Sequence, residues 1–175
     1  KEIRENGLEQ VQVLSPFRIK SDAGVKNLNS GLRELANPLL NNTMEISYGG
    51  TSFRYGDKVM QTKNTETASN GDIGFISKVD KNSDEILTVR FSDHRYKTYT
   101  VDELNQLELA YATTIHKSQG SEYECVILPI LSSFYVMLQR ALIYTAITRA
   151  KKKVILVGQK KALFMAIHKN SSVKR

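Results

Sequence analysis

The sequence predicts an α/β protein whose parallel sheet is interrupted by a small antiparallel β-barrel. Two short apolar runs, Leu109–Ala112 and Cys125–Ile130, are typical of buried parallel strands. Segments with helical spacing follow strand-like runs both early and late in the chain, which favours a parallel sheet. Between Phe53 and Leu107, short β-branched and aromatic runs separated by turn residues indicate the barrel. We therefore expect residues 1–47 and 108–175 to form the α/β domain and residues 48–107 to form the insertion.

The composition is that of an ordinary globular protein, with 41% hydrophobic and 25% charged residues among 175. No apolar run approaches the ~20 residues of a membrane helix, so we expect no membrane partner. A single cysteine, Cys125, excludes a disulfide framework and fits a reducing cytoplasm. One thiol and three widely separated histidines predict no metal site.

The net charge of +7 is concentrated in the last third of the chain. Residues 109–175 contain 11 Lys and Arg against 2 Asp and Glu, whereas residues 47–108 contain 8 against 10. A one-sided basic surface favours a polyanion such as nucleic acid or a nucleotide phosphate. A solvated basic tail explains the same imbalance, and charge alone does not separate the two interpretations.

Individual elements can be assigned along the chain. Before the insertion we expect a strand at Gln10–Leu14 and a helix at Ala23–Ala36, which Asp22 caps and Asn37-Pro38 ends. The apolar face of this helix should consist of Val25, Leu28, Leu32 and Leu35. The expected barrel strands are Lys58–Thr62, Ile73–Val79, Ile86–Phe91 and Tyr96–Val101. After them we expect a strand at Leu109–Thr113, a polar loop opening a short helix, a strand at Cys125–Ile130, a helix at residues 133–148, a buried strand at Lys153–Val157 and a helix at Lys160–His168.

The polar loop at residues 113–122 is the strongest candidate for a ligand site. Its hydroxyl, imidazole, ammonium and amide groups are those that hold phosphate or sugar oxygens, and they belong to Thr113, Thr114, His116, Lys117, Ser118 and Gln119. Gly120 permits close backbone approach, and Glu122 can accept a hydrogen bond from a ribose hydroxyl. The alternative is an ordinary solvated turn between a strand and a helix.

Two arginines are further candidates. Arg149 is expected at the end of a helix just before a buried strand, where a guanidinium can reach a transferring phosphoryl group. The alternative role for Arg149 is a cation stabilised by the helix C-terminal dipole. Arg18 should follow the carboxyl end of the first strand, at the same sheet edge as the loop and Arg149. In the insertion, Asn64 either touches a nucleic-acid backbone or lies in a solvated hairpin, and Gly56-Asp57 is expected to be only a turn.

Some catalytic signatures are absent from the sequence. It contains no G-x-x-x-x-G-K-[ST] phosphate loop, no strand ending in paired acidic residues for Mg²⁺ and no G-x-S-x-G elbow. The chain begins with Lys1 rather than methionine, which suggests a fragment. We therefore expect the chain alone to be catalytically incomplete.

Four segments resemble superfamily 1 helicases, in family order. Ala112–Pro129 resembles motif V, and Leu142–Gly158 resembles motif VI. Val13–Asn37 is similar to the motif IV region of the RecD/TraA-type branch, and Phe53–Ile76 is similar to the segment leading into its SH3-type barrel. The resemblance implies the second RecA-like domain, of the P-loop NTPase-like class, of an ATP-dependent DNA helicase, with its barrel insertion.

The resemblance also implies roles for individual residues. Arg149 corresponds to the motif VI arginine that reaches the γ-phosphate, and Arg18 to a catalytic arginine of motif IV. Gly120 and Glu122 correspond to positions near ATP. Thr114, His116 and Lys117 correspond to the stretch that lies against single-stranded DNA. Ser118 and Asn64 are expected to contact DNA as well.

The remaining expectations concern the whole protein. The phosphate loop and the Mg²⁺ ligands should belong to a first RecA-like domain upstream, which would be the main partner of this chain. The resemblance suggests 5′-to-3′ travel on single-stranded DNA, a bacterial-type cytoplasmic location, and partners in recombination, repair or conjugation. Two alternatives stay open: a nucleic-acid-binding module without enzymatic activity, and a protein docking domain.

Overall fold

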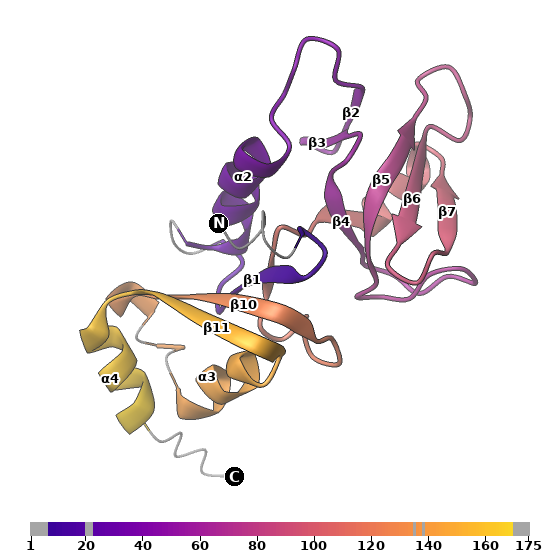
Figure 1. The fold of residues 1–175 in the computed structure, drawn as a ribbon. Helices are drawn as coiled ribbons and strands as arrows, with labels where there is room; N and C mark the ends of the chain where they lie inside the picture. Colours follow the sequence, from indigo (N-terminus) through magenta and orange to yellow (C-terminus); the bar gives the residue numbers. More distant parts are fainter. Residues whose placement is uncertain (1–6, 20–22, 135, 138, 170–175) are drawn as a thin grey trace. The chain divides into compact units, whose positions relative to one another are not determined.

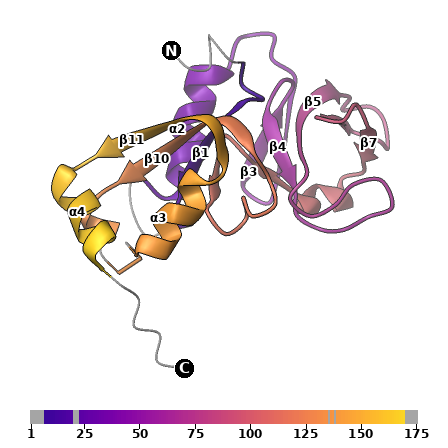
Figure 2. The same ribbon diagram turned by 60° about the horizontal axis from the view of Figure 1, so that its bottom comes forward.

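The computed structural model describes residues 7–19, 23–134, 136–137 and 139–169. Contacts divide the chain into two compact units, shown in two views in Figures 1 and 2. The first unit combines residues 1–28 with residues 112–175, and the second consists of residues 29–111. The second unit is larger than the insertion expected at residues 48–107, whose bounds stay a prediction.

The first unit is built on a four-stranded sheet in which all strands are parallel, as predicted. Its order is β11-β10-β1-β9, and the strands are β1 (Val11–Ser15), β9 (Ala112–Thr114), β10 (Tyr123–Ile130) and β11 (Ala150–Gly158). Strand β1 lies between two neighbours, and all five of its residues are buried. A short apolar run therefore does mark a buried parallel strand here.

Strand β11 differs from its prediction as a buried strand. It occupies the edge of the sheet, and Lys151, Lys152 and Lys153 are exposed. The apolar residues Leu156 and Val157 near its end are also largely exposed. The apolar composition of the run predicts burial, but an edge strand can have the same composition with only one neighbouring strand.

The helices of the first unit lie on the same side of β10 and β11 in both views (Figures 1 and 2). Helix α4 (Lys160–His168) has the bounds that were predicted. The helix expected at residues 133–148 is too long, because a 3-10 turn at Ser132–Phe134 precedes α3 (Arg140–Ile147). The extended backbone of Gln139 separates the two, and residues 135 and 138 lie outside the described residues. None of the described helices is long and apolar enough to cross a membrane.

Helix α2 (Val25–Ala36) confirms the first predicted helix, but its buried face is different. Leu35 is 84% exposed, while Asn29 and Arg33 are buried. These polar side chains are tolerated inside because each has a partner there: Asn29 Nδ2 donates to the Leu109 carbonyl at 3.0 Å. The capping role expected for Asp22 lies outside the described residues.

The second unit contains a five-stranded antiparallel sheet of order β7-β6-β5-β4-β8. Its strands are β4 (Lys58–Gln61), β5 (Ile73–Val79), β6 (Leu87–Phe91), β7 (Tyr96–Tyr99) and β8 (Leu107–Leu109), so the four predicted barrel strands are confirmed. A 3-10 helix at Asp102–Gln106 joins β7 to β8. A separate hairpin of β2 (Glu45–Tyr48) and β3 (Thr51–Arg54) turns at Gly49 and Gly50. A core that includes Phe53, Ile76, Leu87, Val89 and Tyr99 packs inside this unit.

The strand expected at Leu109–Thr113 is in fact two strands in two different sheets. Residues up to Leu109 pair with β4 in the second unit, and Ala112–Thr114 pair with β1 in the first. The chain changes sheets at Ala110 and Tyr111, which are both buried. A continuous apolar run cannot show such a change, because both strands bury their side chains.

Gly158 should tolerate no side chain. Its φ is +145°, and an added Cβ would lie 2.0 Å from the carbonyl oxygen of Ile130, which Gln159 N also contacts at 2.9 Å. We expect Gly158→Ala to lower the free energy of unfolding by about 3 kcal/mol or more. Urea unfolding followed by circular dichroism measures this effect.

The control for Gly158 is Gly120→Ala in the same compact unit. Gly120 also has positive φ, at +87°, but nothing lies within 4 Å of an added Cβ. We expect a loss of about 1–2 kcal/mol there. Equal losses at the two positions would contradict the role of the close approach to Ile130.

Candidate functional site

The carboxyl edge of the parallel sheet brings together the ends of β1 and β9. Ser15 lies opposite Thr114 in the parallel register, and Ile115 N donates to the Ser15 carbonyl at 3.1 Å. The segment that begins at Pro16 and the loop at residues 115–122 both leave from this edge. At such edges, α/β proteins place their ligand sites.

The first of these segments organises the start of α2. The Ser15 hydroxyl donates to the Ala23 carbonyl at 2.7 Å. The carbonyl of Arg18 accepts from Lys26 N at 3.1 Å, so the backbone of Arg18 satisfies one of the first amides of the helix. The Arg18 side chain is exposed at this edge.

The second segment is a compact series of turns at residues 115–120, rather than the predicted opening of a short helix. Thr114 Oγ1 accepts from Lys117 N at 3.2 Å, and the Ser118 hydroxyl donates to the Ile115 carbonyl at 2.8 Å. Ser118 is only 1% exposed, so its hydroxyl serves the turn itself. His116 is exposed and Lys117 half-buried, which leaves these two side chains at the surface of the loop.

Arg149 lies at the opposite, amino edge of the sheet. It directly precedes β11, whose first residue pairs with the first residue of β10. The carbonyl of Arg149 accepts from Tyr123 N at 2.8 Å, at the beginning of β10. The prediction that Arg18, the loop and Arg149 share one edge is therefore wrong for Arg149, because helix α3 returns the chain to the amino ends of the strands before β11 begins.

The guanidinium of Arg149 contacts the end of the 115–122 loop. Nη1 donates to the Ser121 carbonyl at 3.4 Å, and Nη2 donates to Thr148 Oγ1 at 3.4 Å. Both contacts are long for N–H···O bonds. Nε is buried and has no hydrogen-bond partner within the described structure. A guanidinium held this loosely retains donors for a stronger acceptor such as a phosphate oxygen.

The acidic residues near Arg149 are paired with lysines of β11. Glu122 lies 3.6 Å from Lys151, and both side chains are more than half exposed. Glu124 forms a closer pair with Lys152 at 2.6 Å. Exposed pairs of this kind contribute little free energy, so the Glu122 carboxylate can be released to a ligand at small cost.

The loop thus connects two groups of predicted site residues within the first unit. Gly120, Glu122 and Arg149 gather near the amino edge, whereas Thr114, His116 and Lys117 belong to the part that leaves the carboxyl edge. Arg18 belongs with the second group, on the edge opposite to Arg149. The individual roles of all these residues stay predictions.

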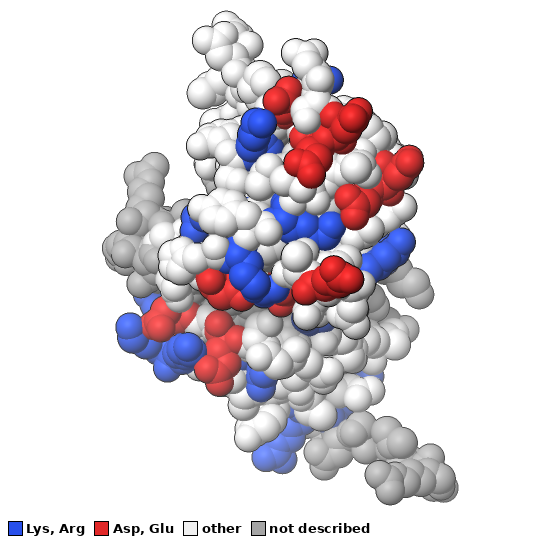
Figure 3. All heavy atoms as spheres, turned by 90° about the vertical axis from the view of Figure 1, so that its right-hand side faces the viewer, with Lys and Arg blue, Asp and Glu red and all other residues white. Residues whose placement is uncertain are grey.

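Asn64 lies in the second unit, where its Oδ1 accepts from Asn70 N at 2.8 Å. Figure 3 shows Lys and Arg side chains interspersed with Asp and Glu on the face that it displays. Several charged side chains of the second unit form ion pairs, including Lys78–Asp80, Arg95–Asp72 and Lys97–Glu103. Such a balanced surface offers a polyanion no one-sided attraction.

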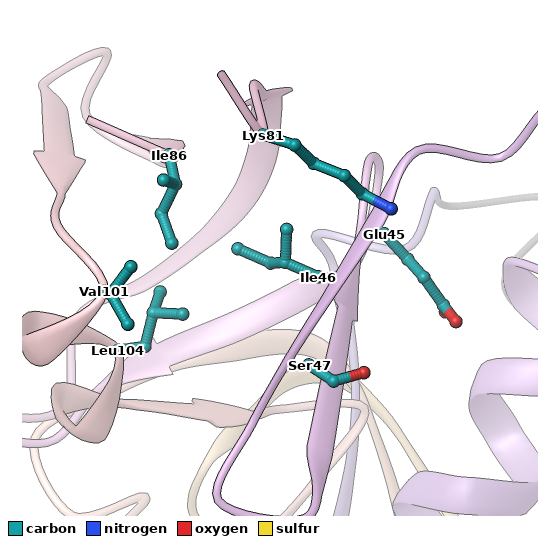
Figure 4. A pocket seen from close by; sticks show the side chains of 7 residues that line it. All are labelled: Glu45, Ile46, Ser47, Lys81, Ile86, Val101 and Leu104. Atoms are coloured by element: carbon teal, nitrogen blue, oxygen red, sulfur yellow. The ribbon is translucent and has the colours of Figure 1, made fainter. Parts of the chain in front are cut away.

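A hollow of about 400 Å³ also opens in the second unit (Figure 4). Four aliphatic side chains point into it, and the polar residues at its rim are few. Its lining consists of Glu45, Ile46, Ser47, Lys81, Ile86, Val101 and Leu104. With one cation and an apolar floor, it lacks the donor set that holds phosphates.

A buried network surrounds Asp57, at a position where the sequence predicts only a turn. Asp57 is 0% exposed. Its carboxylate accepts from Arg33 Nε at 3.1 Å, Asn37 Nδ2 at 2.9 Å and the Tyr111 hydroxyl at 2.9 Å. Arg33 Nη2 lies 2.7 Å from the second oxygen, which also accepts from Arg54 N at 2.8 Å. One signal was present: Asn29 and Arg33 are four residues apart on a helix and therefore share a face.

Comparison with known families identifies the chain. Residues 109–157 match the UvrD-like helicase C-terminal domain, and residues 28–91 match the SH3 domain of ATP-dependent RecD-like DNA helicases. The chain belongs to the RecD-like helicases of superfamily 1. The parallel sheet of the first unit is accordingly that of a RecA-like domain, and the antiparallel sheet of the second unit is its inserted SH3-like domain.

Two curated relatives are similar along most of this RecD-like chain. The ATP-dependent RecD2 DNA helicase of Deinococcus radiodurans is 38% identical over 163 residues, which are 91% of this chain and 22% of the relative. The RecD subunit of the RecBCD enzyme of Haemophilus influenzae is 31% identical over 170 residues, 94% of this chain and 24% of that subunit. The chain thus spans about a quarter of the length of these relatives.

Solved structures support the same fold. Bacteroides Pif1 bound to single-stranded DNA superposes with a TM-score of 0.58 at 17% identity, covering 83% of this chain and 40% of that one. Pif1 helicase from Candida albicans gives a TM-score of 0.57 at 14% identity, covering 90% and 47%. At such low identity the likeness concerns the fold alone.

Ser118 provides a test of the loop geometry. We expect Ser118→Ala to lower the free energy of unfolding by about 1 kcal/mol, because the buried Ile115 carbonyl loses its hydrogen-bond donor. The substitution should also raise the rate of amide hydrogen exchange in residues 115–121. Hydrogen exchange with mass spectrometry measures both effects. Ser133→Ala, at an exposed serine, should change neither quantity. An unchanged exchange rate in the Ser118 variant would show that this hydrogen bond does not hold the turn.

Proposed function

We propose that this chain is the part of an ATP-dependent DNA helicase that closes over the nucleotide and grips single-stranded DNA. The observation that carries the proposal is the contact between Arg149 and the Ser121 carbonyl. It joins the segment similar to motif VI directly to the end of the loop similar to motif V. A change at the nucleotide thus has a short physical route to the residues proposed to touch DNA.

At the amino edge, Arg149 would bind the γ-phosphate of ATP from across a cleft. Its loosely bonded guanidinium and the unpartnered Nε fit an anionic group that is not yet in place. Bound ATP would supply the phosphoryl group on which negative charge develops during hydrolysis. Gly120 would let the loop approach the nucleotide, and Glu122 would leave Lys151 to accept a ribose hydroxyl.

At the other end of the loop, Thr114, His116 and Lys117 would contact the DNA strand. His116 and Lys117 are accessible there, and phosphate contacts of this kind bind strands with little sequence preference. Ser118 would support the turn rather than touch DNA, since its hydroxyl is committed to Ile115. Asn64 would contribute from the SH3-like domain. Arg18, at the edge opposite to Arg149, fits a contact with the strand at least as well as its predicted catalytic role.

The chemistry proposed here needs a first RecA-like domain. Among the described residues, no group of three His, Cys, Asp or Glu side chains is placed to hold a metal ion. In this proposal the first domain contributes the phosphate loop and the carboxylates that hold Mg²⁺, and the present chain does not hydrolyse ATP by itself. Closing and reopening of the cleft between the two domains would drive the strand, as in other ligand-driven closures.

The wider setting follows from the same proposal. We place the protein in a bacterial-type cytoplasm, travelling 5′ to 3′ on single-stranded DNA and working with recombination, repair or conjugation proteins. The relatives in Deinococcus radiodurans and Haemophilus influenzae carry helicase and RecBCD names, which supports this class of pathway. In a module that only binds a DNA strand, the unused hydrogen-bond donors of the Arg149 guanidinium beside the loop would have no role.

Arg149 is tested in the complete protein. We expect Arg149→Ala to reduce DNA-stimulated ATP hydrolysis by about 10³-fold or more, as loss of an arginine that stabilises a transferring phosphoryl group does. Binding of a fluorescent ATP analogue should persist. Arg140→Ala, an exposed cation at the start of α3, serves as the control. Hydrolysis by the Arg149 variant at the wild-type rate would contradict the proposed role.

Lys117 is tested by salt dependence. We expect Lys117→Ala to reduce the slope of log affinity against log salt by about 0.7, the value for one phosphate contact on a single strand. Fluorescence anisotropy with a labelled oligothymidine measures the slope. Lys152→Ala removes a cation that is already paired with Glu124 and should change it less. Equal slopes in wild type and the Lys117 variant would remove Lys117 from the strand-binding surface.

A further inference from the structure

The chain passes between the two compact units twice, at residues 28–29 and at residues 111–112. The first passage lies within helix α2, and the second lies directly before β9. On the side of the second unit, each passage carries a side chain bonded to the Asp57 carboxylate. These side chains are Arg33 in α2 and Tyr111 before β9.

The Asp57 carboxylate is fully occupied by donors from separate parts of the chain. Arg33 binds both carboxylate oxygens, through Nε at 3.1 Å and Nη2 at 2.7 Å. Tyr111 and Asn37 each donate at 2.9 Å. Such a paired arrangement fixes orientation as well as distance, because the guanidinium and carboxylate groups are both planar.

At the second passage, the chain is hydrogen-bonded within the second unit as far as Tyr111. Strand β8 pairs with β4, and Ala110 N then donates to the Lys58 carbonyl at 2.8 Å. The Tyr111 hydroxyl follows with its bond to Asp57. Burial, together with the nearby Asp57 carboxylate, raises the pKa of Tyr111, so the hydroxyl keeps its proton at neutral pH. Asn29 Nδ2 donates to the Leu109 carbonyl at 3.0 Å and thereby ties the two passages to each other.

Breaking one contact of this network while Asp57 stays buried would cost a large free energy. A buried carboxylate that loses a charged partner is left without compensation, which is strongly destabilising. On the side of the second unit, the two passages are therefore held to the same carboxylate. Beyond Tyr111, only β9 separates this anchor from the turns at residues 115–120. Strand β9 has only three residues, so the anchor at Tyr111 and the turns are close in sequence.

We propose that Asp57 is a positioning residue of the helicase cycle, which acts through Tyr111 and Arg33 to transmit displacement of the SH3-like domain to the loop at residues 115–120. The proposal rests on the proposed function, because it assigns Asp57 a part in coupling ATP hydrolysis to strand movement. A positioning role differs from a purely stabilising role in its effect on coupling. Removing the hydrogen bond between Tyr111 and Asp57 should change the number of base pairs unwound per ATP, while the rate of ATP hydrolysis should change little.

The test uses Tyr111→Phe in the complete protein, with Tyr99→Phe as the matched control. Both hydroxyls are buried in the second unit, and burial raises the pKa of both. The Tyr99 hydroxyl donates to Gln61 Oε1 at 2.8 Å, away from either passage. Each change removes one oxygen atom and the buried hydrogen bond that its hydroxyl donates. A second variant, Asn29→Ala, loosens the tie between the passages without touching Asp57.

Three quantities are measured for each variant: thermal stability, hydrogen exchange of residues 112–120, and ATP consumed per base pair unwound. We expect both tyrosine variants to lose a similar few degrees of Tm. Only Tyr111→Phe and Asn29→Ala should speed exchange of residues 112–120. These two should also raise the ATP consumed per base pair at least about two-fold, while DNA-stimulated hydrolysis stays within about two-fold of wild type.

The outcomes separate this inference from the proposed function. If wild-type protein hydrolyses ATP and unwinds DNA, but Tyr111→Phe and Tyr99→Phe show the same exchange and the same ATP per base pair, Asp57 is only structural and the inference is wrong. If the wild-type protein neither hydrolyses ATP with DNA nor unwinds it, the proposed function fails and the positioning role fails with it. A variant that loses hydrolysis, exchange protection and Tm in proportion also overturns the positioning role.

Discussion

A buried carboxylate imposes the strongest constraint on this chain. Burying a carboxylate costs several kcal/mol unless charged and neutral donors surround it, as they surround that of Asp57. Helix α2 contributes Arg33, the residue after it contributes Asn37, and Tyr111 comes from the segment that ends β8. The fold of the second unit can therefore be described as the arrangement that brings these donors to one point. Strand β4 begins directly after Asp57, so the sheet itself starts from this network.

The parallel sheet of the first unit imposes a different constraint, because it has two edges with different chemistry. Thr114 ends β9 at the carboxyl edge, and Arg149 precedes β11 at the amino edge. A single loop joins these edges, and it is held as turns by the hydroxyls of Thr114 and Ser118. One end of the loop contacts Arg149 through Ser121. The two edges are therefore connected by a short element with its own hydrogen bonds.

Periodicity and turn residues were sufficient to predict most elements. The strands β4 to β7 and helix α4 follow from local patterns, because alternation, helical spacing and turn residues are properties of neighbouring positions. The change of sheet at Tyr111 and the edge position of β11 depend on distant partners, which no local pattern contains. The same holds for α2: Leu35 fits an apolar face, but Arg33 is buried because Asp57, 24 residues later, accepts its hydrogen bonds. The prediction of one shared sheet edge is wrong for Arg149, because Arg149 precedes strand β11. A residue that precedes a parallel strand lies at the amino edge of the sheet, whereas a residue that follows one lies at the carboxyl edge.

Buried polar atoms without a hydrogen-bond partner distinguish the two units of this chain. Native proteins satisfy nearly all buried polar atoms, so each exception needs a reason. Among the described residues, Arg33 Nη2 and Glu124 Oε2 lack a hydrogen bond by geometry but lie within ion-pair distance of Asp57 and Lys152. Thr113 Oγ1 and Arg149 Nε have no such partner. Both belong to the first unit, one directly before the 115–120 turns and one beside their end. The charged groups around Asp57 therefore compensate one another, whereas Thr113 Oγ1 and Arg149 Nε have polar capacity that the described residues do not use.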